Sequence, residues 1–162
     1  MNENLLVYVD LDGVLADFDK YYEEQFGLKP TESADEGEFW HRVNLYRAKT
    51  HKGWFSLLPK MPDAKVLWNY LSKNTNFIPL TATGLTRDLS VEEKTRWLYA
   101  YFGYTGPIFF VQSGKDKARF ANPNAVLIDD RAKAIDPWIT AGGIGILHKS
   151  AEETIKILAG LV

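Results

Sequence analysis

The feature that most constrains this chain is a short apolar run that ends in two aspartates and a glycine. Residues 5–9 form the run, and Asp10, Asp12 and Gly13 follow it. Such a run predicts a buried β-strand whose carboxyl end opens into a site. Side chains two residues apart on a strand share a face, so we expect the two carboxylates to converge. Converging carboxylates need a neutralising cation, and a magnesium ion bound to phosphate would supply it.

Apolar runs alternate with helical patterns along the remainder of the chain. The predicted strands cover residues 5–10, 77–81, 108–111, 126–129 and 144–147. The predicted helices of the same region cover residues 63–73, 90–102, 115–121, 132–141 and 151–158. This alternation predicts an α/β fold in which a parallel sheet lies between two layers of helices.

One long segment, between the first strand and the helix at residue 63, breaks the alternation. It is much longer than a βαβ crossover requires. Helical patterns cover residues 17–26 and 36–50, with a loop from Pro30 between them. We interpret residues 16–60 as a small helical cap inserted into a core of residues 1–15 and 61–162. Caps at such positions exclude water and select substrates.

Composition and charge limit the expected partners and location. The net charge is −2 and basic residues are scattered, so we expect no long nucleic acid as a partner. The chain has no cysteines, which excludes disulfides and thiolate metal sites. No signal peptide or membrane span is recognisable, so we expect a cytoplasmic protein without a membrane partner. The aromatic content of 14% leaves rings available to line a pocket.

Polar residues follow each of the first four predicted strands. They are Asp10 and Asp12, then Thr81 and Ala82, then residues 113–117 with two lysines, and finally Asp129 and Asp130. In an open parallel sheet, sites form beyond the carboxyl ends of the strands. We therefore expect acids, a hydroxyl and a lysine to meet at one edge of the sheet.

These residue types suit the hydrolysis of a small phosphate ester. Asp10 is ionised at neutral pH and is the predicted nucleophile, which would form an aspartyl-phosphate. Asp12 is the predicted general acid, which then deprotonates the incoming water. Thr81 and backbone N–H groups of the turn from Ala82 are expected to donate to phosphoryl oxygens.

A lysine and a metal ion complete the predicted catalytic group. Lys117 is the predicted lysine that neutralises the transferring phosphoryl group, and Lys115 remains an alternative. The expected cofactor is Mg²⁺, because hard cations take carboxylate and phosphate oxygens together. Its predicted ligands are Asp10, Asp12 through its carbonyl, Asp129 and, through a bound water, Asp130.

The order of these residues resembles the four motifs of the haloacid-dehalogenase (HAD) superfamily of phosphatases. The motifs run from Asp10 to Asp130 and so span most of the chain. The resemblance implies the HAD fold, a three-layer Rossmann-like parallel sheet, and two-step phosphoryl transfer through Asp10.

A narrower resemblance links residues 10–18 to the 5′(3′)-deoxyribonucleotidases. It implies a nucleoside monophosphate substrate, with the base near Phe18 and the aromatics Phe39, Trp40 and Trp54 of the cap. Residues 91–97 resemble a helix that carries a second phosphate-binding lysine, here Lys94. For each ring, packing inside the cap is the alternative, because rings at helical spacing are usually core residues.

Other functions remain open from the residues alone. The same core would also suit a sugar phosphate or a polynucleotide 3′-phosphate, although the cap aromatics favour a base. A non-catalytic phospho-acceptor domain also combines acids, a threonine and a lysine around Mg²⁺. The presence of Asp12 and of a second acid pair after the lysine favours an enzyme. The preferred base and sugar, the phosphate position and the oligomeric state stay undetermined.

Overall fold

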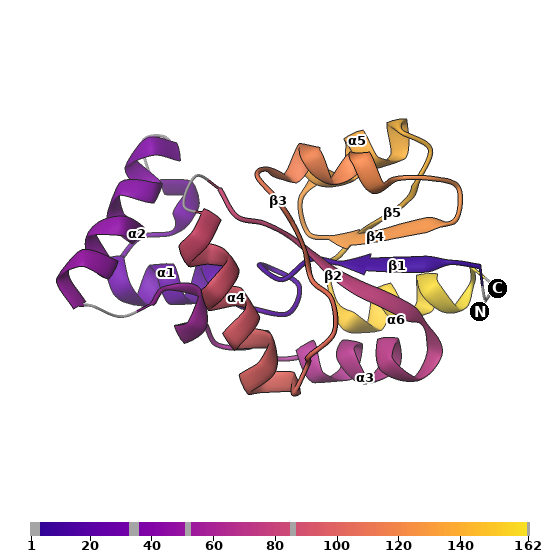
Figure 1. Cartoon of the computed structure of the whole chain (residues 1–162), viewed down its shortest axis with the longest axis horizontal. Helices are drawn as coiled ribbons and strands as arrows, with labels where there is room; N and C mark the ends of the chain where they lie inside the picture. The colour runs from indigo at the N-terminus through magenta and orange to yellow at the C-terminus, as the bar shows by residue number, and fades with distance from the viewer. Residues whose placement is uncertain (1–3, 33–35, 51–52, 85–86, 162) are drawn as a thin grey trace.

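Five parallel strands form a single sheet in the order β3-β2-β1-β4-β5 (Figure 1). The computed structural model describes residues 4–32, 36–50, 53–84 and 87–161. The strands are β1 (Leu6–Val9), β2 (Asn76–Ala82), β3 (Phe109–Val111), β4 (Ala125–Asp129) and β5 (Ile144–Leu147). All five predicted strands are confirmed, and so is the parallel α/β sheet.

The order of the strands creates a switch point beside β1. The chain passes outward from β1 to β2 and β3 and then returns to β4 on the other side of β1. In the register, Val9 of β1 lies opposite Pro79 of β2 and Ile128 of β4. Ligands of open parallel sheets bind at such a point, beyond the carboxyl ends of the strands.

Helices cover both faces of the sheet, as Figure 1 shows. They are α3 (Ala64–Asn74), α4 (Arg87–Phe102), α5 (Ala132–Thr140), α6 (Ala151–Ala159) and the 3₁₀ helix η3 (Gly114–Phe120). Helices α3 and α6 lie on one face, and α5 with η3 lies on the other. The predicted helix at 115–121 is therefore a 3₁₀ helix, whereas the other four predictions in the core are confirmed.

Strand β1 is buried on both faces, which explains its continuous apolar run. Val7 and Val9 point into the core that includes Leu67 and Leu71 of α3. Tyr8 points to the opposite face, where its ring lies 5.5 Å from that of Trp138 in α5. The strand that positions the first acids is thus held from both sides.

The helical insert predicted after the first strand is confirmed. It contains α1 (Phe18–Phe26), η1 (Pro30–Glu32), α2 (Glu36–Thr50) and η2 (Phe55–Leu57), beyond the carboxyl end of β1 (Figure 1). The loop predicted from Pro30 begins as η1 and continues into residues 33–35, which lie outside the described residues. Among the described helices, none is long and apolar enough to cross a bilayer.

The two ends of the insert are joined to each other by backbone contacts. Ala16 and Lys60 form an antiparallel bridge. The N–H of Asp17 donates to the carbonyl of Pro59 at 2.8 Å, and that of Met61 donates to the carbonyl of Leu15 at 2.7 Å. The chain therefore leaves and rejoins the core at a single place.

Candidate active site

A tight loop after β1 carries the first two acids. The N–H groups of Val14, Leu15 and Ala16 all donate to the carbonyl of Leu11, which folds the chain back on itself. Gly13 adopts a φ of +85°, a region that favours glycine. The loop holds Asp10 at the end of the strand and turns the chain toward the insert.

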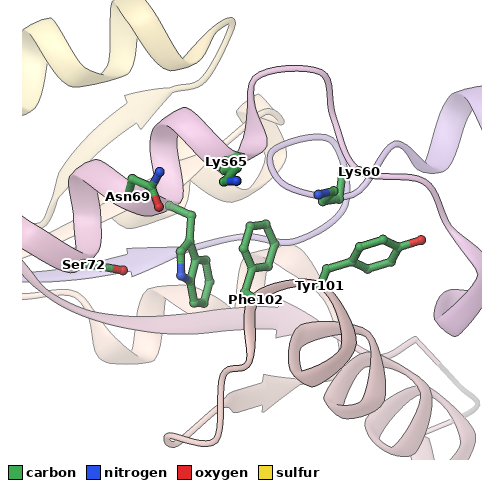
Figure 2. A pocket seen from close by; sticks show the side chains of 7 residues that line it. Lys60, Lys65, Asn69, Ser72, Tyr101 and Phe102 are labelled. Carbon is green, nitrogen blue, oxygen red and sulfur yellow. The ribbon is translucent and has the colours of Figure 1, made fainter.

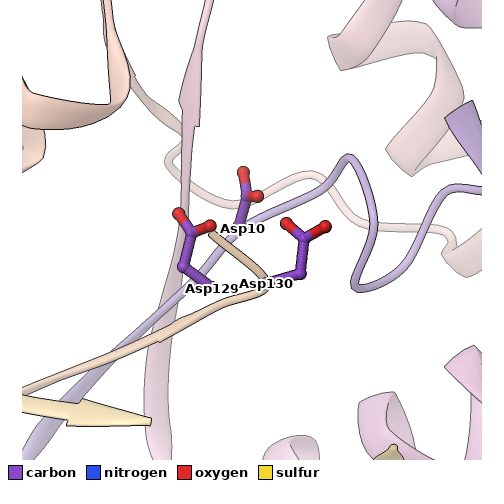
Figure 3. A group of neighbouring side chains, drawn as sticks. All are labelled: Asp10, Asp129 and Asp130. Carbon is purple, nitrogen blue, oxygen red and sulfur yellow. The ribbon is translucent and has the colours of Figure 1, made fainter. Parts of the chain in front are cut away.

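Asp10, Asp129 and Asp130 form a compact acid cluster at the switch point, shown in Figure 3. Each offers a carboxylate oxygen, and these oxygens lie within 4.8 Å of one another. Asp10 and Asp129 are buried, and Oδ1 of Asp130 is buried without a hydrogen-bond partner among the described residues. Adjacent strands β1 and β4 bring these residues together from distant parts of the sequence.

The cluster is short of positive charge. Burial, followed by the neighbouring carboxylate of Asp10, raises the pKa of Asp129 to about 6 and that of Asp130 to about 8. Buried carboxylates at this separation favour their protonated forms unless a cation lies between them. Three hard oxygen donors and an orphaned oxygen atom fit a divalent cation such as Mg²⁺.

Lys117 bridges two of the three acids. Its Nζ donates to Oδ1 of Asp10 at 2.9 Å and to Oδ2 of Asp129 at 2.7 Å, and the side chain is 2% exposed. Burial alone would lower the pKa of Lys117, but the two carboxylates outweigh it and raise that pKa. Lys115, the alternative, is exposed to solvent.

Lys94 lies at the same edge of the sheet, next to the predicted general acid. Its Nζ donates to Oδ2 of Asp12 at 3.0 Å, to Oγ1 of Thr81 at 2.7 Å and to the carbonyl of Ala82 at 2.7 Å. The Asp12 carboxylate is thus paired with Lys94 and lies outside the three-acid cluster. Its predicted metal contact was through its carbonyl, which this pairing leaves unaffected.

Two backbone N–H groups of the turn after β2 already donate hydrogen bonds to carbonyls of the protein. The N–H of Thr83 donates to the carbonyl of Val111 at 2.8 Å, and that of Gly84 donates to the carbonyl of Gln112 at 2.9 Å. These two N–H groups were expected to bind phosphate, but they join the turn to the chain at the end of β3. The Thr81 hydroxyl and the lysines are therefore the stronger candidates for phosphate contact.

The predicted aromatic residues of the insert fall into two groups. Trp54 is 0% exposed and Phe18 is 6% exposed, with their ring centroids 5.8 Å apart. The Phe39 ring stacks on Phe18 at 5.4 Å but stays partly exposed. Trp40 is also partly exposed, and its ring lies against Gly84 in the turn after β2. Trp40 thus reaches the core from the insert, whereas Trp54 packs inside the insert.

The ion pair between Arg47 and Glu93 was not predicted. Arg47 lies in α2, Glu93 lies in α4, and Nη2 of Arg47 is 2.7 Å from Oε2 of Glu93. A glutamate beside a lysine on a helix usually marks a solvated face, so no local signal in the sequence indicated this pair.

A separate hollow of about 280 Å³ lies between α3 and the end of α4, shown in Figure 2. Its lining includes Lys60, Trp68 and Tyr101 and none of the predicted site residues. The Lys60 ammonium lies 5.3 Å from the centroid of the Tyr101 ring. The hollow contributes no group to the acid cluster.

The fold is the one found in solved HAD-like hydrolases, and the acid cluster lies at its switch point. The structure is similar to a haloacid dehalogenase-like hydrolase from Xanthomonas campestris, with a TM-score of 0.64, 14% identity and coverage of 97% of this chain and 91% of that one. The family model "5′ nucleotidase, deoxy (pyrimidine), cytosolic type C" matches residues 4–155. The chain belongs to this family and is a phosphoric monoester hydrolase.

Two further solved structures share the fold. CbbY from Rhodobacter sphaeroides, in complex with phosphate, has a TM-score of 0.53 and 18% identity, and covers 90% of this chain and 85% of its own. YfnB from Bacillus subtilis, bound to magnesium, has a TM-score of 0.51 and 14% identity, and the match covers 96% of this chain and 98% of that one. No curated protein sequence matches the chain. At these identities the structural resemblances concern the fold alone.

Proposed function

We propose that the protein is a Mg²⁺-dependent phosphatase of nucleoside monophosphates that acts through an aspartyl-phosphate on Asp10. The observation that carries the proposal is the convergence of the Asp10, Asp129 and Asp130 oxygens within 4.8 Å, beside the Lys117 ammonium. The family description names deoxy and pyrimidine nucleotides and the cytosol. We therefore propose a deoxypyrimidine nucleoside monophosphate as the preferred substrate and the cytoplasm as the location.

The acid cluster is the proposed metal site. Asp10, Asp129 and Asp130 would hold the ion, with the Asp12 carbonyl as a further ligand. The orphaned Oδ1 of Asp130 and the raised pKa values support this assignment, because buried carboxylates that repel one another favour the binding of a cation. When bound, Mg²⁺ supplies charge neutralisation for the carboxylates and for the phosphate oxygens.

Asp10 and Asp12 divide the proposed chemistry between them. Lys117 holds one oxygen of Asp10, and the other oxygen is the proposed nucleophile. As the Asp10–phosphorus bond forms, the bond from phosphorus to the ester oxygen breaks, and Asp12 donates a proton to that oxygen. Asp12 then removes a proton from water, whose oxygen attacks phosphorus and releases phosphate from Asp10.

The insert is the proposed cap, residues 16–60, and it would select the substrate. Phe39 and Trp40 keep partly exposed rings, and Trp40 reaches the turn after β2. We propose that these two rings contact the base, while Phe18 and Trp54 support them from inside the cap. Thr81, Lys94 and the backbone N–H of Ala82 are the proposed phosphate contacts. The hydrogen bonds of Lys94 to the Thr81 hydroxyl and the Ala82 carbonyl, which keep these groups together, support this.

Kinetics on a panel of phosphate esters test the proposal. The panel contains deoxypyrimidine and purine nucleoside monophosphates, their 3′ isomers, sugar phosphates and a 3′-phosphorylated oligonucleotide. We expect Mg²⁺-dependent turnover with a preference for the deoxypyrimidine monophosphate. Equal rates on nucleotides and sugar phosphates would contradict the proposed substrate.

The Asp10→Asn substitution tests the mechanism. It keeps the size of the side chain and removes the nucleophilic carboxylate, so turnover should fall at least about a thousandfold, while the far-ultraviolet circular dichroism spectrum stays unchanged. A stable aspartyl-phosphate without turnover in the wild type would instead favour a phospho-acceptor domain. Substantial activity of the variant would exclude Asp10 as the nucleophile.

A further inference from the structure

Helix α4 carries two consecutive buried charges that serve different regions. Glu93 is 7% exposed and Lys94 is 1% exposed. Consecutive residues of an α-helix point about 100° apart, so their side chains leave the helix in different directions. Lys94 points to Asp12 at the candidate active site, whereas Glu93 points to the insert.

The insert supplies four donors to the Glu93 carboxylate. Oε1 accepts from the N–H of Trp54 at 2.9 Å and from Nε of Arg47 at 3.2 Å. Oε2 accepts from the N–H of Phe55 at 3.2 Å and from Nη2 of Arg47 at 2.7 Å. Each side chain of this ion pair is 9% exposed. The Glu93 carboxylate thus makes a bidentate ion pair with Arg47 and also accepts from two backbone N–H groups. Such an arrangement is strongly directional, so it fixes the insert on α4.

Phe55 connects this ion pair to the lysine of the site. Its ring centroid lies 5.7 Å from Cζ of Arg47 and 4.4 Å from Nζ of Lys94. Cations at these distances are attracted to an aromatic ring. Lys94 in turn donates to Asp12. A continuous series of contacts therefore runs from Arg47 in the insert to the proposed general acid.

We propose that Arg47 and Glu93 are positioning residues that hold the Lys94 ammonium on Asp12. Their ion pair fixes Phe55 against α4, and Phe55 and α4 together fix the direction of the Lys94 side chain. The kinetic part of this inference rests on the proposed phosphatase function. It follows from the inference that the position of the insert on the core determines where the Lys94 ammonium lies relative to Asp12.

The Arg47→Gln substitution removes the guanidinium and tests the inference by chemical labelling. Mild acylation of the folded protein, followed by mass spectrometry, measures how fast each lysine reacts. We expect Lys94 to react about tenfold faster in the variant, because its environment opens. Lys117 is equally buried, at 2% exposed, but lies in η3, so its rate should stay unchanged.

Kinetics supply the second measurement. In the Arg47→Gln variant, kcat should fall about ten- to a hundredfold for both a nucleoside monophosphate and p-nitrophenyl phosphate. Both esters would form the same aspartyl-phosphate, whose hydrolysis uses Asp12 as the base. A rise in KM for the nucleotide alone would instead indicate that the pair only closes the insert over the base, and would overturn the inference.

Two further variants serve as controls. Arg96→Gln makes the same chemical change on α4, where Arg96 pairs with Glu92 in solvent and is 72% exposed, so it should behave as the wild type. Arg47→Lys keeps the positive charge but not the bidentate geometry, so it should restore only part of the protection of Lys94.

The remaining outcomes separate this inference from the proposed function. Lys94 staying as protected in Arg47→Gln as in the wild type would overturn the inference. Lys94 and Lys117 becoming reactive together would also overturn it, because that pattern reports general loosening of the fold. A wild type that hydrolyses no phosphate ester would contradict the proposed function, while the labelling would still decide this inference.

Discussion

At the residue scale, Gly13 and Asp130 show how closely the loop after β1 approaches the end of β4. A Cβ placed on Gly13 would lie 2.0 Å from Oδ2 of Asp130, and the φ of +85° already disfavours other residues. Two separate requirements, backbone conformation and space, therefore meet at this one position.

The substitution Gly13→Ala should destabilise the protein by about 2–4 kcal/mol, because it adds backbone strain and displaces Asp130. Gly27→Ala is the matched control, since Gly27 has a φ of +73° and no described atom within 4 Å of an added Cβ. That variant should lose only about 1 kcal/mol. Urea unfolding with and without Mg²⁺ measures both, and equal losses would show that the approach to Asp130 is unimportant.

Single residues differ in how well the sequence predicts them. The meeting of Asp10 with Asp129 and Asp130 follows from parallel strands, whose carboxyl ends share one edge. Glu93 was missed because its partners are backbone N–H groups and an arginine far away in the sequence. Local patterns carry no information about such contacts.

At the element scale, the 3₁₀ helix η3 determines which lysine reaches the acids. Ser113 and Asp116 form a capping box at its start, in which Oδ2 of Asp116 accepts from the N–H of Ser113 at 3.1 Å and from its hydroxyl at 2.9 Å. These two hydrogen bonds lower the pKa of Asp116. The box orients the first turn, so Lys117 points inward and Lys115 points to solvent.

Removing the box in Asp116→Ala should lower kcat about tenfold, because Lys117 loses its fixed direction. Asp116→Asn keeps one carbonyl oxygen as an acceptor and should retain most of the activity. Steady-state kinetics on a nucleoside monophosphate compare the two variants. Equal activity of both variants and the wild type would mean that η3 holds Lys117 without its cap.

The helices and strands were largely predictable from the sequence, but which side chains of the insert contact the core was not. The excess length after β1 was sufficient to predict the helical insert. Phe39, Trp40, Val43 and Tyr46 of α2 recur at helical spacing and mark one face, but this spacing does not show which ring meets the core. The sequence therefore could not distinguish Trp40, which reaches the core, from Trp54, which packs inside the insert.

At the scale of the whole molecule, the acid cluster links folding to proton binding and, as the proposed metal site, would link both to a cation. The raised pKa values of Asp129 and Asp130 mean that the metal-free folded protein binds protons that the unfolded chain has released. The stability of the metal-free protein should therefore fall as the pH rises from about 4 towards about 8. A bound cation replaces these protons, so metal affinity should rise over the same range.

We expect Mg²⁺ binding at neutral pH to release protons, mainly from Asp130, whose pKa is about 8. Titration calorimetry in two buffers with different heats of ionisation counts the released protons. Asp130→Asn should abolish most of the release while the fold is retained. An affinity that is the same at about pH 6 and about pH 8.5 would contradict the proposed metal site.

The adjoining ends of the insert, at Ala16 and Lys60, make this part of the chain exchangeable in principle. A different segment could replace the insert between these two positions without moving the loop after β1 or the sheet. Any such segment would still have to offer Glu93 a cation and two backbone N–H groups, or leave a buried carboxylate uncompensated. Under the proposed role of the insert, substrate preference would change with the insert, provided that any replacement still compensates the charge of Glu93.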